Sequence, residues 1–118
     1  MSHGEEDTIA AEATARGRGA IALIRVSGPA AFAIVKRHVV TWPENQRRAT
    51  LCTIRDGNGD VLDEALVTTF VAPASFTGED VVEIATHGGA IVPTLVLAAL
   101  VASGARVALP GEFTRRLC

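Results

Sequence analysis

Two charged residues stand inside strand-like apolar runs, where a charge is unusual. Glu83 follows Val81 and Val82, and Arg25 lies in the run I-A-L-I-R-V. Alternation along a strand places Glu83 on the same face as Val81 and opposite Val82. Glu83 therefore faces either solvent or a pocket that supplies hydrogen-bond donors. In a pocket, its carboxylate would hold the adjacent N–H donors of a ligand such as a pterin ring.

Arg25 raises the same question on another strand. A guanidinium in a pocket could contact a ring carbonyl oxygen or a carboxylate of a ligand. The alternative is an ion pair within the protein. The candidate acidic partners of Arg25 are then Glu83, Asp80 and Glu79. The residues alone leave both interpretations open.

The stretch from Pro73 to Gly89, P-A-S-F-T-G-E-D-V-V-E-I-A-T-H-G-G, surrounds Glu83. A loop, a strand and a helix start follow one another there, an arrangement typical of a ligand-binding wall. His87 is interpreted first as a helix cap or packing residue, next as a ligand contact, and last as a base. A single histidine with no cysteine or second histidine nearby is poor evidence for a metal, and no serine or cysteine pairs with it. Gly88 and Gly89 allow close backbone approach to a ligand or an anion.

The elements that must position these residues alternate between strands and helices. Strands are expected over the run T-I-A-A-E-A-T after Asp7 and over Ala20 to Val26, Ala49 to Ile54, Val61 to Phe70, Val81 to Ile84 and Arg106 to Leu109. Helices are expected over Ala30 to His38 and Ala90 to Ala102, and a turn or helix begins at Pro110. This order predicts one α+β domain over residues 7–118, a mixed β-sheet with helices on one face, after a flexible tail of residues 1–6.

Local signals fix several of these elements. Turn dipeptides between Asp56 and Asp60 predict a hairpin, and they lack the later glutamate of a calcium loop. Lys36, Arg37 and His38 suit the negative end of the first helix dipole. The second helix is apolar on nearly every face, so we expect it to be buried on more than one side and to meet a subunit or domain partner.

Composition excludes several classes of function. The chain has 118 residues, a net charge of −2 and one lysine. It therefore lacks the stripe of basic residues that would indicate direct binding of tRNA. It contains no P-loop, and the G-x-G-x-x-A match beginning at Gly17 leads into a strand, where the dinucleotide fingerprint requires a helix. Residues 1–6 do not have the pattern of a signal peptide, and the longest apolar run is too short to span a membrane. We expect the two cysteines to be reduced. These features predict a cytoplasmic protein.

Several motifs together resemble the N-terminal domain of the tRNA modification GTPase MnmE (TrmE) family. They occur in order over almost the whole chain: D-T-I-A from Asp7, G-R-G from Gly17, I-R-V-S-G from Ile24, S-F-T-G-E-D-V-V-E from Ser75, H-G-G from His87 and P-G-E-F-T from Pro110. The resemblance implies a fold shared with folate-binding aminomethyltransferases, a homodimer and a bound tetrahydrofolate derivative, either 5-formyl or 5,10-methylene. It assigns the folate-contacting arginine and glutamate to Arg25 and Glu83. We expect Phe76, Thr77, His87 and Gly88 to be further residues of the pocket.

The resemblance also implies the wider context of such a domain. The full family protein adds a helical domain and a GTPase domain that uses GTP, magnesium and potassium. With an FAD-dependent partner protein it installs an aminomethyl-type group on the wobble uridine of certain tRNAs. We expect the present chain to be a folate-binding and dimerising module that is not catalytic alone. The alternatives are a self-contained one-carbon aminomethyltransferase-like enzyme and a purely structural dimerisation fragment.

The chain departs from the family pattern at several positions. Arg16 replaces the usual proline, Ala20 and Ala22 replace glycines, and Thr86 precedes His87 where glycine or cysteine is usual. The family also continues past P-G-E-F-T into an A-F-x-N-x-K segment whose lysine belongs to the folate site, and this chain ends first, at Cys118.

Overall fold

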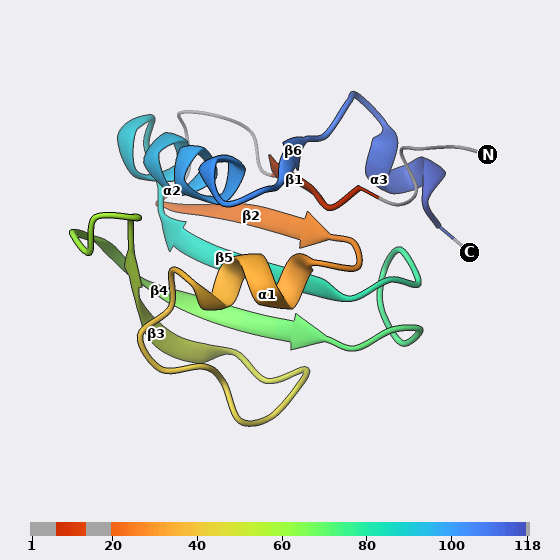
Figure 1. Ribbon diagram of the computed structural model, residues 1–118, viewed down its shortest axis with the longest axis horizontal. Helices are drawn as coiled ribbons and strands as arrows, with labels where there is room; N and C mark the ends of the chain where they lie inside the picture. Colours follow the sequence, from red (N-terminus) through yellow and green to blue (C-terminus); the bar gives the residue numbers. More distant parts are fainter. Residues whose placement is uncertain (1–6, 14–19, 118) are drawn as a thin grey trace.

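A computed structural model describes residues 7–13 and 20–117 of the chain. The expected tail of residues 1–6, the G-R-G motif at Gly17 and Cys118 lie outside the described residues. Within the described part, strands form one mixed sheet in the order β3-β4-β5-β2-β1-β6, accompanied by three helices (Figure 1). The predicted α+β class with a mixed sheet is confirmed.

The strands lie close to their predicted positions. Their bounds are β1 Ile9–Glu12, β2 Ile21–Ser27, β3 Thr50–Arg55, β4 Val61–Phe70, β5 Val81–His87 and β6 Arg106–Val107. Only β6, which pairs with β1, is parallel to its neighbour, and the other described strand pairs are antiparallel. The strand β5 runs three residues further than predicted, to His87, and β6 is two residues shorter.

The helices α1 (Ala31–Lys36) and α2 (Ile91–Ala102) cover one face of the sheet, and α3 (Glu112–Arg115) lies beside the start of β1 (Figure 1). Between the sheet and these two helices lies the hydrophobic core, which includes Val26, Val67, Val82, Ile84, Val96 and Leu100. Residues of β2, β4 and β5 that alternate with the core residues point to the opposite face, which we call the Arg25 face. Arg25 and Glu83 belong to that face.

The turn from β2 into α1 depends on close contact with the start of β1. Gly28 has a φ of 143°, and a Cβ atom at this position would lie 2.6 Å from the Cα atom of Thr8. The hydroxyl oxygen of Thr8 accepts a hydrogen bond of 2.8 Å from the amide of Ala30, just before α1. The D-T-I-A and S-G-P segments are therefore parts of a single corner.

The hairpin between β3 and β4 forms as predicted. The Asp56 side chain accepts hydrogen bonds from the amides of Asn58, at 2.9 Å, and Asp60, at 3.0 Å. A carboxylate that bonds to the backbone just after it in this way is a common turn former.

The end of α1 differs from the prediction. The helix stops at Lys36, and His38 lies beyond it, buried to 3% exposure. One His38 ring nitrogen bonds the carbonyl oxygen of Arg55 at 2.8 Å, and the other bonds the Ser103 hydroxyl at 2.7 Å. His38 therefore connects three elements through its ring, and it lies after the helix rather than in its last turn, where the prediction placed it.

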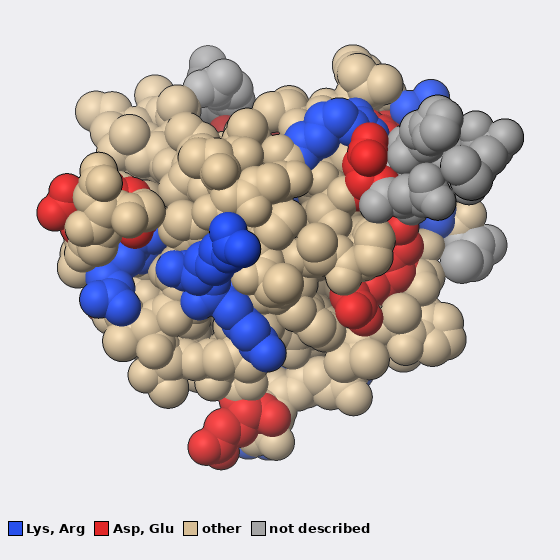
Figure 2. Space-filling view, in the orientation of Figure 1, with Lys and Arg blue, Asp and Glu red and all other residues tan. Residues whose placement is uncertain are grey.

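The second predicted helix begins at Ile91, after the N-cap residue Ala90, and His87 does not cap it. It buries only one side, through Pro93, Val96, Ala99 and Leu100. Ile91, Leu95 and Val101 remain exposed, so within this chain α2 is covered on one side, and the expectation that a partner covers the other side stays a prediction. Figure 2 shows an uncharged surface over α2, next to Lys and Arg side chains that gather over α1. No helix in the described ranges is long and apolar enough to cross a membrane.

Candidate functional site

The two charged strand residues lie opposite each other in the sheet. Arg25 on β2 and Glu83 on β5 are direct partners in the antiparallel register, so their side chains leave the sheet on the same face. Arg25 Nε and Nη2 both donate to Glu83 Oε2, at 3.0 and 2.9 Å. The ion-pair interpretation of Arg25 is therefore realised in the structure.

This ion pair remains accessible to a ligand. The Arg25 and Glu83 side chains are 20% and 25% exposed. Both contacts use the same carboxylate oxygen, and among the described residues no hydrogen bond is formed to the other oxygen, Oε1. A carboxylate has acceptor capacity on both oxygens, so Glu83 keeps capacity for further N–H donors.

Two aromatic rings flank the arginine. The guanidinium carbon of Arg25 lies 4.8 Å from the ring centroid of Phe76 and 5.7 Å from that of Phe113. Phe76 comes from the loop between β4 and β5, whereas Phe113 comes from α3. Such contacts hold a guanidinium in place and contribute about 0.5 to 1 kcal/mol each where they are exposed.

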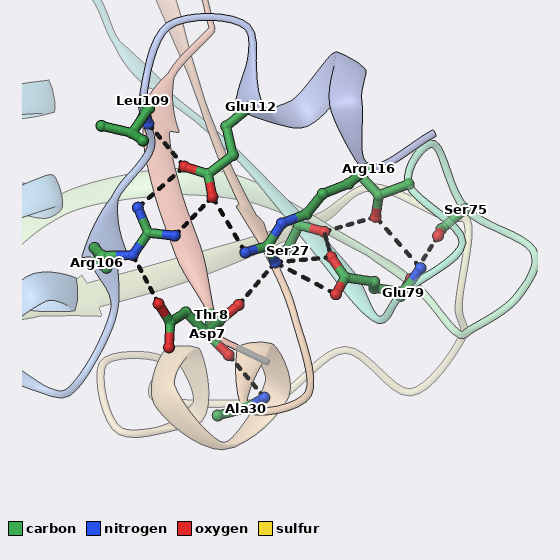
Figure 3. Close-up of polar contacts among 11 residues, drawn as sticks. Asp7, Thr8, Ser27, Ala30, Ser75, Glu79, Arg106, Leu109, Glu112 and Arg116 are labelled. Carbon is green, nitrogen blue, oxygen red and sulfur yellow. Dashed lines mark hydrogen bonds and ion pairs between the residues drawn. The ribbon is translucent and has the colours of Figure 1, made fainter. Parts of the chain in front are cut away.

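Thr77 lies next to Phe76 but points into the protein. It is buried to 2% exposure, and its hydroxyl lies 2.6 Å from that of Ser27. The Ser27 hydroxyl also donates to Glu79 Oε1 at 2.8 Å (Figure 3). Thr77 and Ser27 therefore fix the loop that carries Phe76.

A cluster of ion pairs attaches the C-terminal segment to this loop (Figure 3). The Glu112 carboxylate accepts from Arg106 at 2.6 and 3.0 Å, from Arg116 at 3.3 Å and from the amide of Leu109 at 2.8 Å. Arg116 also contacts Glu79 at 3.1 Å. The hydrogen bonds from Arg106 lower the pKa of Glu112 from 4.5 to about 2. We call Glu79, Arg106, Glu112 and Arg116 the ionic cluster.

β5 begins at Val81, near the loop that carries Phe76, and ends at His87. His87 and Gly88 therefore lie at the end of the strand that is remote from Phe76. The His87 ring bonds Asp63 at 2.7 Å and is exposed, and the Gly88 amide donates to the Ala20 carbonyl oxygen at 2.8 Å. The structure thus brings Arg25, Glu83 and Phe76 together, and it places Thr77 behind them. It does not bring His87 or Gly88 to them.

Phe113 is a site residue that the sequence did not indicate. Phe113 belongs to the P-G-E-F-T motif. The aromatic residue after Gly-Glu in this motif is the feature of the sequence that could have indicated a role for it. Among the residues that the structure describes, no group of three or more His, Cys, Asp or Glu side chains is arranged to hold a metal. The arrangement at Arg25 is suited to binding: a carboxylate for N–H donors, a guanidinium for an acceptor, and aromatic walls for a flat ring.

Comparison with known proteins places the chain in a family. The family model described as GTP-binding protein TrmE N-terminus matches residues 8–117. The chain is similar to the tRNA modification GTPase MnmE of Akkermansia muciniphila, with 54% identity over 94% of the chain and 25% of that protein. It is also similar to the MnmE proteins of Legionella pneumophila (strain Corby), with 47% identity over 93% of the chain and 25% of the relative, and of Aliarcobacter butzleri, with 46% identity over 95% and 25%.

These relatives are much longer than the chain, which spans about a quarter of their length. The matched region nevertheless contains nearly all the described residues and both members of the Arg25–Glu83 pair. The chain belongs to the family of TrmE N-terminal domains found in tRNA modification GTPases.

Proposed function

We propose that this domain binds a tetrahydrofolate derivative of the 5-formyl or 5,10-methylene type, and that it does so within a GTPase that modifies the wobble uridine of tRNA. The observation that carries the proposal is the partly exposed Arg25–Glu83 pair beside the Phe76 and Phe113 rings. The names of the relatives support the tRNA-modifying context.

The residues present fit a reduced pterin ring. Glu83 Oε1 can accept from the adjacent N–H groups of the ring, and Arg25 can donate to its carbonyl oxygen. The phenyl rings provide apolar walls on which a flat ligand packs. When bound, the folate supplies a one-carbon unit, while the protein side chains orient the ring and limit the access of water to it.

Calorimetric titration of the purified chain with 5-formyl-tetrahydrofolate tests this proposal. We expect the wild type to bind and Glu83→Ala to lose measurable affinity, because the ring N–H donors would lose their acceptor. The matched control is Glu64→Ala, which removes an exposed carboxylate from β4, near the end of β5 remote from Phe76. We expect this control to bind like the wild type.

Other outcomes contradict the proposal in different ways. Affinity that survives Glu83→Ala would remove Glu83 from the site. Absence of binding by the wild type would mean that the domain does not recognise the ligand by itself and serves as a scaffold, as the structural alternative holds.

We also propose that the domain forms a homodimer through the exposed side of α2. Ile91 and Leu95 lie one helical turn apart there, with exposures of 73% and 47%, and α2 carries no charged residue. An uncharged apolar face can meet its own copy across a two-fold axis. Sedimentation velocity at micromolar concentration should show a dimer for the wild type and a monomer for Leu95→Glu. A monomeric wild type would contradict this proposal.

A further inference from the structure

Arg47 has an unusual backbone conformation close to the candidate site. Its φ is 63°, and it is the only non-glycine residue in the described ranges with a positive φ. The Arg47 amide donates to the carbonyl oxygen of Thr69 at 2.7 Å, and the Gln46 side chain accepts from the amide of Val71 at 3.3 Å. Strained backbone of this kind costs about 1 to 3 kcal/mol and occurs preferentially at ligand sites.

The Arg47 side chain lies on the Arg25 face. Its guanidinium carbon is 5.3 Å from the Phe70 ring centroid, and Nη1 donates to the Ala74 carbonyl oxygen at 2.9 Å. Phe70 and Thr68 point to the same face of β4, and Thr68 is the register partner of Glu83. Arg47 and the Arg25–Glu83 pair therefore lie on the same surface.

A cleft extends from Arg47 to Phe76, one of the two rings around Arg25. Its volume is about 440 Å³, and its lining consists of Arg47, Phe70, Pro73, Ala74, Ser75 and Phe76. Phe76 is shared, because its ring also contacts the Arg25 guanidinium. The Phe76 ring thus borders this cleft and also the guanidinium that pairs with Glu83.

The sheet register gives the spacing between the two arginines. Arg25 pairs with Glu83, Glu83 pairs with Thr68, and the backbone of Arg47 bonds β4 on the side away from β5. Three strand spacings of about 4.8 Å place the two arginine backbones roughly 14 Å apart. A ligand that reaches both must be elongated, with N–H donors at one end, an apolar middle and an anionic end.

We propose that Arg47 binds the glutamate carboxylates of the folate tail, and that the cleft between Phe70 and Phe76 holds the aryl group that links ring to tail. This inference rests on the proposed folate binding. The planar guanidinium matches a carboxylate, and its contact with Ala74 leaves further N–H donors for one. In the described residues no carboxylate of the protein forms an ion pair with Arg47.

The test compares 5-formyl-tetrahydrofolate with its dimethyl ester, which keeps the ring and aryl group but has no tail charge. Calorimetry is carried out on the wild type, Arg47→Gln, Arg47→Lys and the matched control Arg48→Gln, which removes the adjacent exposed arginine. We expect wild type and control to bind the acid about five- to tenfold more tightly than the ester. Arg47→Gln should bind both ligands alike, and Arg47→Lys should lie between, because lysine keeps the charge but not the fork.

The outcomes separate this inference from the proposed function. The ratio of the affinity for the acid to the affinity for the ester is compared between the wild type and Arg47→Gln. If this ratio is the same in both proteins, the assignment of the tail to Arg47 is overturned while folate binding stands. If the wild type binds neither ligand, the proposed function itself fails and the inference fails with it. Thermal unfolding of each variant shows whether Arg47→Gln retains the fold, since the strained backbone remains in both proteins. If Arg47→Gln does not fold, Arg47→Lys is used for the test instead. The ratio of its affinity for the acid to its affinity for the ester must then be lower than that of the wild type.

Discussion

Two ion-pair arrangements, the ionic cluster and the Arg25–Glu83 pair, differ in how fully their carboxylates are used. Glu112 in the ionic cluster is buried to 5% and accepts hydrogen bonds on both oxygens. Glu83 is 25% exposed and accepts from Arg25 on one oxygen only. A carboxylate that is buried and hydrogen-bonded on both oxygens holds its protein partners in place, whereas an accessible one with an unused oxygen can also accept hydrogen bonds from a ligand. The ionic cluster is therefore structural, and the Arg25–Glu83 pair is suited to binding.

The largest effect that distinguishes the two is on stability. Glu112→Gln removes the charge that Arg106 and Arg116 share and leaves the buried Arg116 without its i,i+4 partner. Breaking a buried pair in this way costs about 3 to 5 kcal/mol of unfolding free energy. Urea denaturation followed by circular dichroism measures the loss. The control Glu44→Gln changes an exposed loop carboxylate and should leave the midpoint unchanged, and a loss below about 1 kcal/mol for Glu112→Gln would contradict the structural role.

The same carboxylate should give the fold a defined acid sensitivity. The folded-state pKa of Glu112, about 2, lies below its ordinary value of 4.5. The stabilisation from its ionised form is thus fully present above about pH 4.5 and is lost as the pH falls toward 2. The stability difference between wild type and Glu112→Gln should shrink over that interval. A difference that stays constant from pH 6 to about pH 3 would contradict the assigned pKa direction.

A smaller effect on stability is expected at the binding pair. Glu83→Gln should change the unfolding free energy by no more than about 1 kcal/mol, because partly exposed ion pairs contribute little. Its effect should appear in folate affinity, as the amide replaces part of the acceptor capacity with donors. Urea denaturation and calorimetry on the same preparation give both quantities. A stability loss equal to that of Glu112→Gln would remove the distinction between the two arrangements.

Local sequence signals predicted most of the fold. Alternating apolar residues defined the central strands, and the turn residues at Asp56 and Asp60 defined the hairpin. The prediction failed where a distant partner decides the outcome. His38 follows a helix and carries a polar ring, yet it is buried because Ser103 and the Arg55 carbonyl satisfy both nitrogens. Nothing within a few residues of His38 indicates those partners.

The candidate site was predicted in the same uneven way. Arg25 and Glu83 were visible as charges within apolar strands, and their pairing follows from the register of β2 and β5. Glu112 was not assigned a role, although its partners Arg106, Leu109 and Arg116 all lie within six residues of it. The contact that the sequence does not indicate is the one between Arg116 and Glu79, which are 37 residues apart. Arg47 lies in a loop with no periodic pattern, and its importance depends on a backbone angle that the sequence does not reveal.

The smallest predicted effect tests how the two arrangements are connected. The ionic cluster holds α3, and α3 carries Phe113, whose ring lies 5.7 Å from the Arg25 guanidinium. Phe113→Leu keeps an apolar side chain but removes the cation–π contact, so folate affinity should fall about two- to fivefold with little change in stability. Phe113→Tyr keeps the ring and should bind like the wild type. Equal affinities of the leucine variant and the wild type would mean that the ionic cluster fixes the C-terminal segment without contributing to the site. A loss confined to the leucine variant would show that the structural cluster helps to position the binding arginine through a single aromatic ring.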